Sequence, residues 1–320
     1  MSVVAEFAAL LHRDYPSRAR RTSSMEFQAK TERLGDIQAV IFDVYGTLVD
    51  YWQNAFNDEE EKGALLRSVF TQTSDFFHFT PFLEKINPSM SPGETLFDFY
   101  HNLIGMKHEE ARKKGKDFPE IEIDEIWHVI LSILENNGYV PTGYIEDLPR
   151  NEAARIVAYY YNFFALNRGF FPEVFATLQA LRQDNISLGI LSNAQFYTPI
   201  DMNHFLREQS NNTVVDLYEL FDLDLCFYSY QYGIAKPGEF LYTRLLSALK
   251  SMEIAPSQTL FVGNDLELDM MSAREVGLRT AFFTGNKEST FLHGRGEEFV
   301  PDLSFSHFSQ LPEKVSFHGV

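Results

Sequence analysis

Apolar runs of strand length alternate with segments of helical spacing along the second half of the chain. Each apolar run ends in a polar or glycine-rich loop, and the segments between the runs carry apolar residues three and four positions apart. This alternation predicts a doubly wound, Rossmann-like parallel sheet of the α/β class. The predicted strands are 39–42, 187–191, 223–228, 258–262 and 279–283, the helices between them are 174–184, 239–252 and 270–276, and residues 302–311 are expected to cover the sheet edge.

The stretch between the first two of these strands has a different pattern. Residues 51–167 contain no further apolar run followed by a carboxylate, and prolines and glycines divide them into segments of helical spacing. We therefore expect a helical domain inserted after the first strand. Its predicted helices are 57–70, 94–104, 123–136 and 152–164.

The first 35 residues match neither pattern. Residues 3–11 have the spacing of a short amphipathic helix, and the stretch after them is locally basic. A transit peptide has a similar composition, but Glu6 and Asp14 interrupt this one, so we favour an N-terminal arm. The predicted division of the chain is an arm at 1–35, a core at 36–50 and 168–320, and a helical domain at 51–167.

Composition excludes several classes of protein. With 45% apolar and 15% aromatic residues the chain has ample material for a core, and its net charge of −18 repels nucleic acid and anionic membranes. The one cysteine, Cys226, rules out an internal disulfide and a cysteine-based zinc site, and no apolar run is long enough to span a membrane. We therefore expect a cytoplasmic protein, in which a small anionic substrate would need local positive charge or a metal ion. The composition indicates no oligomeric state.

Side chains that suit hydrolytic chemistry follow the first two predicted strands. The first strand ends in Asp43, followed by Gly46 and Thr47, and an ionised carboxylate there can attack a substrate without a base. Ser192 and Asn193 follow the second strand, where a hydroxyl and backbone N–H groups can hold anionic oxygens. Taken singly, each motif is also the ordinary chemistry of a turn or a helix N-cap.

Two later loops supply a positive charge and further oxygen ligands. Lys236 precedes Pro237, which restricts the local backbone and so aims the ammonium group. Asn264, Asp265 and Asp269 cluster after the fourth predicted strand, and hard cations such as Mg²⁺ bind a few oxygen ligands of this kind. A solvated lysine and an acidic helix N-cap are the alternatives at these two places.

Taken together and in this order, the four loops resemble the motifs of the haloacid dehalogenase-like hydrolases. The run from Ala39 to Asp50 resembles the first motif, in which an aspartate at a strand end precedes a Gly-Thr-Leu turn. The resemblance implies a nucleophilic aspartate, a helical cap after the first strand, and Mg²⁺ that bridges the nucleophile and the phosphoryl oxygens. It implies catalytic roles for Asp43, Tyr45, Thr47 and Lys236, substrate binding by Ser192, Asn193 and Lys236, metal binding by Asp43, the backbone of Tyr45 and either Asn264 or Asp265, and support from Gly46 and Asp269.

One residue departs from the phosphatase version of the first motif. Tyr45 stands where most phosphatases of the family have a second aspartate that acts as acid and base, and Asp-x-Tyr-Gly-Thr resembles the metal-free 2-haloacid dehalogenases instead. Those enzymes also have an arginine soon after the motif, whereas the first arginine after Tyr51 here is Arg67. The acidic loop at 264–269 favours a cation, because its carboxylates and Asp43 would otherwise repel one another.

These observations rank three functions. A Mg²⁺-dependent phosphatase that acts on a small phosphorylated metabolite comes first, because the fourth loop suits a cation. A metal-free dehalogenase that hydrolyses a carbon–halogen bond comes second, because of Tyr45. A phosphate-binding or regulatory protein with little turnover comes third, because general acid and base help is worth about 10²–10⁴ in rate and its usual residue is absent.

Overall fold

The central sheet is built from the buried apolar runs of the sequence. In the computed structural model, which describes residues 2–16 and 23–317, six strands of the described chain pair in parallel in the order β5-β4-β1-β6-β7-β8. The first strand is central and the strand order reverses beside it, which is where ligands bind in sheets of this kind. The doubly wound α/β fold predicted from the sequence is confirmed. The strands are β1 Ala39–Phe42, β4 Ser187–Ser192, β5 Cys226–Tyr228, β6 Thr259–Gly263, β7 Arg279–Phe283 and β8 Leu303–Phe305.

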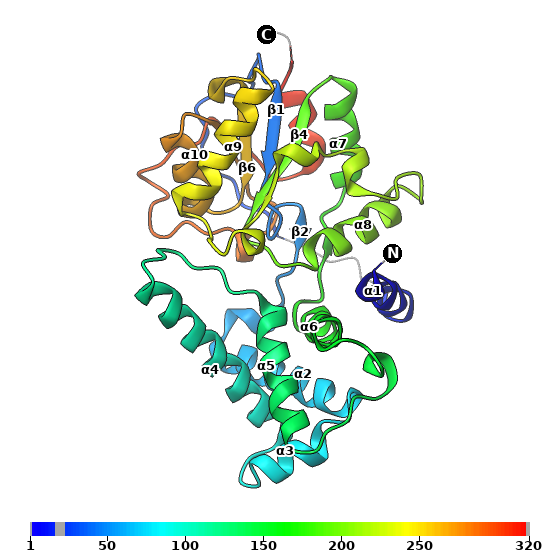
Figure 1. The fold of residues 1–320 in the computed structure, drawn as a ribbon. Helices are drawn as coiled ribbons and strands as arrows, with labels where there is room; N and C mark the ends of the chain where they lie inside the picture. The colour runs from blue at the N-terminus through cyan, green and yellow to red at the C-terminus, as the bar shows by residue number, and fades with distance from the viewer. Residues whose placement is uncertain (1, 17–22, 318–320) are drawn as a thin grey trace. The chain divides into compact units, whose positions relative to one another are not determined.

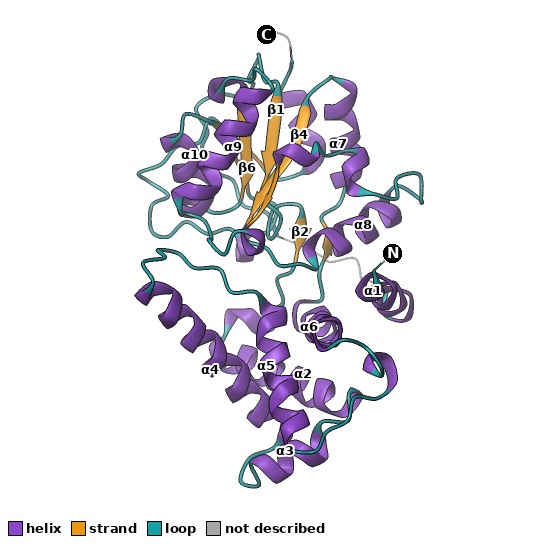
Figure 2. Ribbon diagram, viewed as in Figure 1, coloured by secondary structure: helices purple, strands orange, loops and turns teal. Residues whose placement is uncertain are grey.

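Helices cover both faces of the sheet because successive strand residues point to opposite sides. Val40 and Phe42 of β1 belong to one apolar cluster, and Ala39 and Ile41 belong to the other. Helices α7, α8 and α11 supply the first cluster, and α9 and α10 supply the second; Figures 1 and 2 show α7 and α8 on one side of the strands and α9 and α10 on the other. These helices are α7 Val174–Gln183, α8 Thr198–Gln209, α9 Glu239–Ser251, α10 Ser272–Glu275 and α11 Leu311–Lys314.

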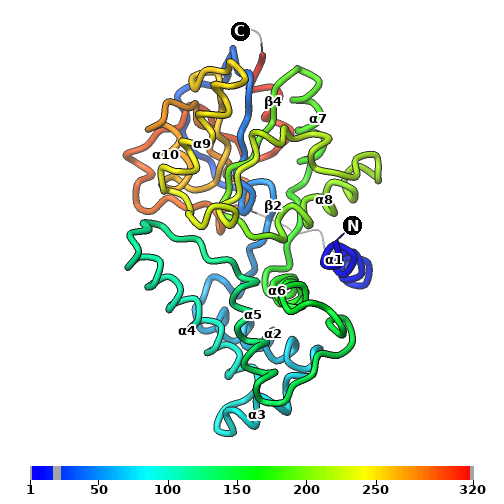
Figure 3. Tube along the Cα trace, viewed as in Figure 1, coloured from blue at the N-terminus to red at the C-terminus, as the bar shows by residue number. Residues whose placement is uncertain are grey.

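A short antiparallel ladder joins the two ends of the helical insertion. Strand β2 (Val49–Asp50) pairs with β3 (Gly169–Phe170), so the chain leaves the sheet and returns to it at one place. The residues between them can therefore fold as a separate unit, which is the cyan to green part of the trace in Figure 3. Of the described residues, 2–16 and 53–168 form the helical unit, and 23–52 and 169–317 form the sheet unit.

The helices of the helical unit follow from apolar spacing and capping residues. Helix α5 is the helix predicted at 123–136, because its buried stripe is complete. Helix α4 begins two residues before its predicted start, because Ser91 and Glu94 form a capping box around Pro92 in the first turn. The helices are α1 Val3–Asp14, α2 Glu59–Phe76, α3 Thr80–Ile86, α4 Pro92–Lys113, α5 Ile123–Asn136 and α6 Arg150–Leu166, with 3₁₀ turns η1 Asn54–Asn57 and η2 Gly143–Ile145.

Aromatic stacking holds the helical unit together. Phe70 stacks on Tyr161 with ring centroids 4.2 Å apart, and Phe76 stacks on Tyr160 at the same separation. The second contact explains why α2 continues to Phe76, six residues beyond its predicted end at position 70, although residues 71–75 are mostly polar. Among the described residues, no helix combines the length and the apolar character that a membrane span requires.

Two predictions near the ends of the sheet are wrong. Residues 302–311 do not cover the sheet edge, because Leu303–Phe305 pairs with β7 and is itself the edge strand. Residues 223–225 form the 3₁₀ turn η4 rather than part of a strand, because the Leu225 N–H donates back to the carbonyl of Asp222.

The helix predicted at 270–276 starts four residues earlier than expected. It opens as the π-helical turn η7 (Leu266–Met271), in which the Asp265 side chain accepts the N–H groups of Glu267 and Leu268. Helices α3 and α8 were not apparent in the sequence, because their apolar stripes are short: α3 buries Leu83 alone.

We expect the Phe70→Ala variant to lower the free energy of unfolding by about 3–5 kcal/mol, because it removes a fully buried ring from the aromatic core of the helical unit. Chemical denaturation measures the change. Phe118→Ala, which truncates a ring that is 51% exposed, serves as the control and should change the same free energy by less than about 0.5 kcal/mol. Equal effects of the two variants would contradict the assigned core.

Candidate active site

Lys236 lies between two carboxylates at the carboxyl edge of the sheet. Its Nζ donates to Asp43 Oδ1 at 2.7 Å and to Asp269 Oδ1 at 2.5 Å, and all three side chains are buried. Asp43 follows β1 and Asp269 lies in η7 after β6, so the pairing of these strands brings the two carboxylates together. Three residues selected from separate loops of the sequence therefore meet in one ion-pair cluster.

Electrostatics keep the ammonium group charged. Burial by itself lowers the pKa of Lys236, but Asp269 and Asp43 outweigh it and raise that pKa above its ordinary value. Burial raises the pKa of Asp269, the Lys236 ammonium opposes this rise, and the nearby Asp43 and Asp265 carboxylates add to it. Two carboxylates thus share one lysine, and the Asp265 carboxylate nearby adds to the negative charge of the site.

Asp269 also fixes the loop that follows β6. Its Oδ2 accepts the backbone N–H groups of Asn264 and Asp265, each at 3.1 Å. Gly263 ends the strand beside it, and a Cβ at that position would collide with the Asp269 carboxylate. The glycine is therefore required for the close approach of the acidic loop to the strand end.

Asn264 joins this loop to the loop after β1. Thr47 Oγ1 donates to Asn264 Oδ1 at 2.9 Å, and Asn264 Nδ2 donates to the carbonyl of Ser289 at 2.5 Å. Gly46 has a φ of +83°, and a Cβ there would collide with the Asn264 amide. The structure thus brings Gly46, Thr47 and Asn264 together beside Asp43.

The residues after β4 hold the lysine in place. Asn193 Oδ1 accepts the backbone N–H of Lys236 at 2.6 Å, and Asn193 Nδ2 donates to the carbonyl of Lys236 at 3.2 Å. The Ser192 hydroxyl is buried and has no hydrogen-bond partner among the described residues. An unsatisfied buried hydroxyl costs about 1–3 kcal/mol, which an anionic oxygen of a ligand would offset. Substrate binding by Ser192 and Asn193 remains a prediction.

Asn264 and Asp265, the two alternatives for the predicted metal ligand, differ in the hydrogen bonds that their side-chain oxygens accept. Asp265 Oδ1 accepts two N–H groups of η7, and its Oδ2 lies 2.9 Å from His293 Nε2. Asn264 Oδ1 accepts from Thr47, in the loop of Asp43. No group of three or more His, Cys, Asp and Glu side chains in the described part of the chain is arranged to hold a metal. The excess negative charge and the oxygen donors nevertheless fit Mg²⁺, which keeps several waters and needs one or two carboxylates.

Tyr45 is held by a neighbour that the sequence did not indicate. Its hydroxyl lies 2.9 Å from Thr198 Oγ1, in the first turn of α8, and its ring meets that of Tyr51 edge to face. The phenol is therefore held against α8 and Tyr51. Its catalytic role, like those of Asp43, Thr47 and Lys236, remains a prediction.

Sequence reasoning also missed the segment after β7. Phe291 N–H donates to the carbonyl of Asn264, and Leu266 N–H donates to the carbonyl of Phe291, each at 2.9 Å. With the Ser289 and His293 contacts described above, these bonds fasten residues 289–293 along the acidic loop. The segment follows the predicted strand at 279–283, and this place at the carboxyl edge of the sheet is the signal that could have indicated it.

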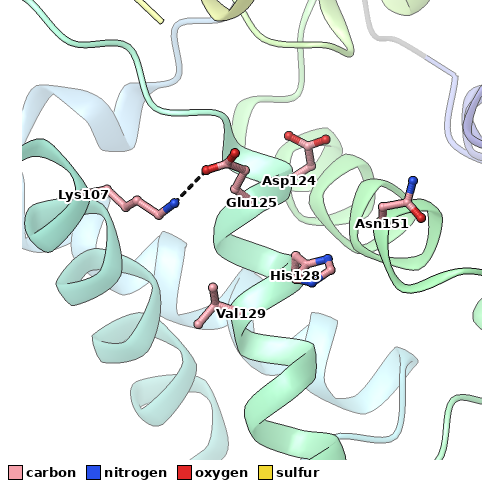
Figure 4. Close-up of a pocket in the computed structure, with 6 residues that line it drawn as sticks. All are labelled: Lys107, Asp124, Glu125, His128, Val129 and Asn151. Carbon is pink, nitrogen blue, oxygen red and sulfur yellow. Dashed lines mark hydrogen bonds and ion pairs between the residues drawn. The ribbon is translucent and has the colours of Figure 1, made fainter. Parts of the chain in front are cut away.

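A hollow of about 310 Å³ lies within the helical unit, and the predicted site residues lie elsewhere, in the sheet unit. Lys107 Nζ of α4 pairs with Glu125 Oε2 of α5 at 2.7 Å, and Arg155 of α6 pairs with Asp124 of α5 at 2.8 Å. These ion pairs join neighbouring helices, so both carboxylates that line the hollow already have a basic partner. Figure 4 shows the lining residues Lys107, Asp124, Glu125, His128, Val129 and Asn151.

Comparison with known proteins identifies the family of the chain. A family model described as haloacid dehalogenase-like hydrolase matches residues 37–277. Among solved structures, a 2-haloacid dehalogenase from Pseudomonas syringae pv. Tomato aligns with a TM-score of 0.51 and 22% identity, over 87% of this chain and 97% of that one. At this identity the likeness shows the fold alone.

Two curated relatives are phosphatases by name. The chain is 28% identical over 148 residues to a ribulose-1,5-bisphosphate 5-phosphatase of Halopiger xanaduensis, covering 45% of this chain and 56% of that protein. It is 24% identical over 173 residues to a glyceraldehyde 3-phosphate phosphatase of Methanopyrus kandleri, covering 52% and 65%. The chain thus spans less than two thirds of the length of the relatives it matches.

We expect Asp269→Ala to lower the free energy of unfolding by about 3–5 kcal/mol, because it leaves the buried Lys236 ammonium short of a partner. Urea denaturation at neutral pH measures this. Glu298→Ala removes one exposed carboxylate that pairs with Arg295 and should cost less than about 1 kcal/mol. A similar small cost for both variants would show that the buried pair does not support the loop.

Proposed function

The chain belongs to the haloacid dehalogenase-like hydrolases, and from this premise we propose that it is a phosphatase that hydrolyses a small phosphorylated metabolite through a covalent intermediate on Asp43. The observation that carries the proposal is the buried Lys236 ammonium, 2.7 Å from the carboxylate that ends the central strand. The phosphatase names of two relatives support the same reaction class. The helical unit is proposed as the cap that selects the substrate.

The proposed reaction has two displacements at phosphorus. An Asp43 oxygen bonds to phosphorus while the bond to the leaving alcohol oxygen breaks, and water then attacks the aspartyl phosphate to release inorganic phosphate and restore the carboxylate. Lys236 offsets the charge of the nucleophile and of the transferring phosphoryl group. The Ser192 hydroxyl and the N–H groups after β4 are proposed to hold the remaining phosphoryl oxygens.

The site lacks the usual residue for proton transfer in both steps of the proposed reaction. The leaving oxygen needs a proton and the attacking water must lose one, which the second aspartate of the family's phosphatases performs. Tyr45 stands there, and a phenol with an ordinary pKa of ~10 can donate a proton but is a poor base at neutral pH. We therefore infer slow hydrolysis of the aspartyl phosphate.

Mg²⁺ is the proposed cofactor. Asp43, the Asn264 side-chain oxygen and the backbone carbonyl of Tyr45 would hold it, and it would offset charge on the phosphoryl oxygens. We favour Asn264 over Asp265 because the Asn264 oxygen meets Thr47 in the loop of Asp43, whereas the Asp265 oxygens bind η7 and His293. Asp265 is then a loop-stabilising residue.

Dehalogenase-type hydrolysis is the second candidate. The Lys236 ammonium lies against the Asp43 carboxylate, and the Tyr45 hydroxyl shares a hydrogen bond with Thr198. An arrangement of this kind suits attack of a carboxylate on carbon without a metal. The two candidates differ in their dependence on Mg²⁺ and in the bond that breaks.

We expect Asp43→Asn to remove the hydrolysis of a generic aryl phosphate in the presence of Mg²⁺, with a loss of about 10³-fold or more, because the amide is not a nucleophile. Steady-state rates measure the loss, and a mass increase of one phosphoryl group on the wild-type chain after rapid quenching detects the intermediate. The exposed Asp224→Asn is the matched control and should keep the wild-type rate. Activity that survives in Asp43→Asn excludes the proposed nucleophile.

Removal of divalent cations with a chelator should abolish turnover, and added Mg²⁺ should restore it. As a readout independent of activity, Mg²⁺ should raise the midpoint of thermal unfolding of the wild type but not that of Asp43→Asn. Halide release from a 2-haloacid that resists the chelator would replace the phosphatase with the second candidate. Phosphate binding without turnover of either substrate would indicate the low-turnover class.

A further inference from the structure

Four aromatic rings form a continuous row that begins two residues after Asp43. The centroids of Tyr45 and Tyr51, of Tyr51 and Trp52, and of Trp52 and Phe291 are each 6.0 Å apart, and each pair meets edge to face. All four side chains are half-buried, so each keeps part of its surface accessible. We call Tyr45, Tyr51, Trp52 and Phe291 the aromatic row.

Hydrogen bonds fasten Trp52 and Phe291 of the aromatic row to the loops of the site. Phe291 exchanges backbone hydrogen bonds with Asn264 and Leu266, as described above. The backbone N–H of Trp52 donates to Asp50 Oδ1 at 3.2 Å, and Asn286 Nδ2 donates to the same Oδ1 atom at 3.2 Å. The row is therefore held by the loops that carry Asp43 and Asn264, which favours a fixed binding surface.

The surroundings of the aromatic row are acidic, but the row itself is neutral. Asp43 lies two residues before Tyr45, and the Asp50 carboxylate accepts the backbone N–H of Trp52. Phenol, indole and phenyl side chains carry no charge at neutral pH. A substrate group placed here meets apolar ring surface, and a negative charge on that group is disfavoured.

Resting on the proposed phosphatase activity, we propose that the aromatic row binds the alcohol portion of the substrate and selects phosphate monoesters whose leaving group carries a neutral planar ring. Aromatic pairs of this geometry add affinity beyond the burial of area, by about two- to tenfold for each pair. A ring-bearing ester gains these contacts, whereas a short sugar or triose phosphate does not fill them. The substrate class inferred here thus differs from those named for the two curated phosphatases.

Two esters with matched leaving groups test the proposal. Benzyl phosphate and cyclohexylmethyl phosphate both release a primary alcohol of similar size, but only benzyl alcohol has a planar ring. We expect KM for benzyl phosphate to be about tenfold lower in the wild type, a difference of about 1.4 kcal/mol, with similar kcat for both esters. Equal KM values for the two esters would overturn the proposal.

Leucine substitutions test whether the aromatic row causes the preference for benzyl phosphate. Trp52→Leu and Phe291→Leu keep an apolar side chain but remove the ring, so each should raise KM for benzyl phosphate toward that of the cyclohexylmethyl ester without changing kcat. Tyr218→Leu, which removes a ring that is 39% exposed on the turn η3 (Leu217–Glu219) before β5, is the matched control and should leave the preference intact. An unchanged preference in both row variants would also overturn the proposal.

Binding of the corresponding phosphonates separates failure of the aromatic row from failure of the phosphatase. Calorimetric titration with benzylphosphonate and cyclohexylmethylphosphonate requires no turnover. The protein could bind benzylphosphonate selectively, lose this selectivity in Trp52→Leu, and yet hydrolyse no phosphate ester. That result would support binding by the aromatic row and reject the phosphatase. Hydrolysis of phosphate esters together with equal affinity for the two phosphonates would reject selection by the aromatic row and support the phosphatase. Binding of neither phosphonate would reject both proposals.

Discussion

The buried ammonium of Lys236 is the constraint on which the rest of the site depends. A lysine this deep in a protein is stable only with carboxylate partners, because removing a charge from water costs several kcal/mol. Asp43 and Asp269 are those partners, and each comes from the end of a different central strand. The same interaction therefore fixes the nucleophile proposed for catalysis and the loop proposed to hold a cation.

The other polar contacts of the site serve this arrangement. Asn193 binds both backbone groups of Lys236 and so sets the position from which its side chain reaches Asp43. Asp269 uses its second oxygen to hold the backbone after β6, and Asn264 connects that backbone to Thr47. These groups are buried, so breaking any of the hydrogen bonds would leave a polar group without a partner and away from water. This cost favours a single conformation of the loops. Preorganisation of this kind is what electrostatic catalysis requires.

The segment after β7 extends the site beyond the four loops that the family motifs describe. It binds the acidic loop through Ser289 and Phe291 and contributes one ring to the aromatic row. The family model establishes the hydrolase family, and the solved structure at 22% identity shows the fold, but neither determines this surface. In this molecule the proposed reaction centre and the proposed specificity surface are therefore positioned by the same hydrogen-bonded loops.

The sequence by itself determined the elements whose burial is periodic along the chain. The strand at 39–42 and the helix at 123–136 match the structure to the residue, and Asp43, Lys236 and Asp269 could be selected because each lies in a loop after a strand or directly before a proline. Only the tertiary structure decided the partners of the candidate residues, the edge strand β8, and the approach of Phe291. Periodicity is a local property, whereas the bond between Thr47 and Asn264 joins residues 217 positions apart and depends on the order in which the strands pair.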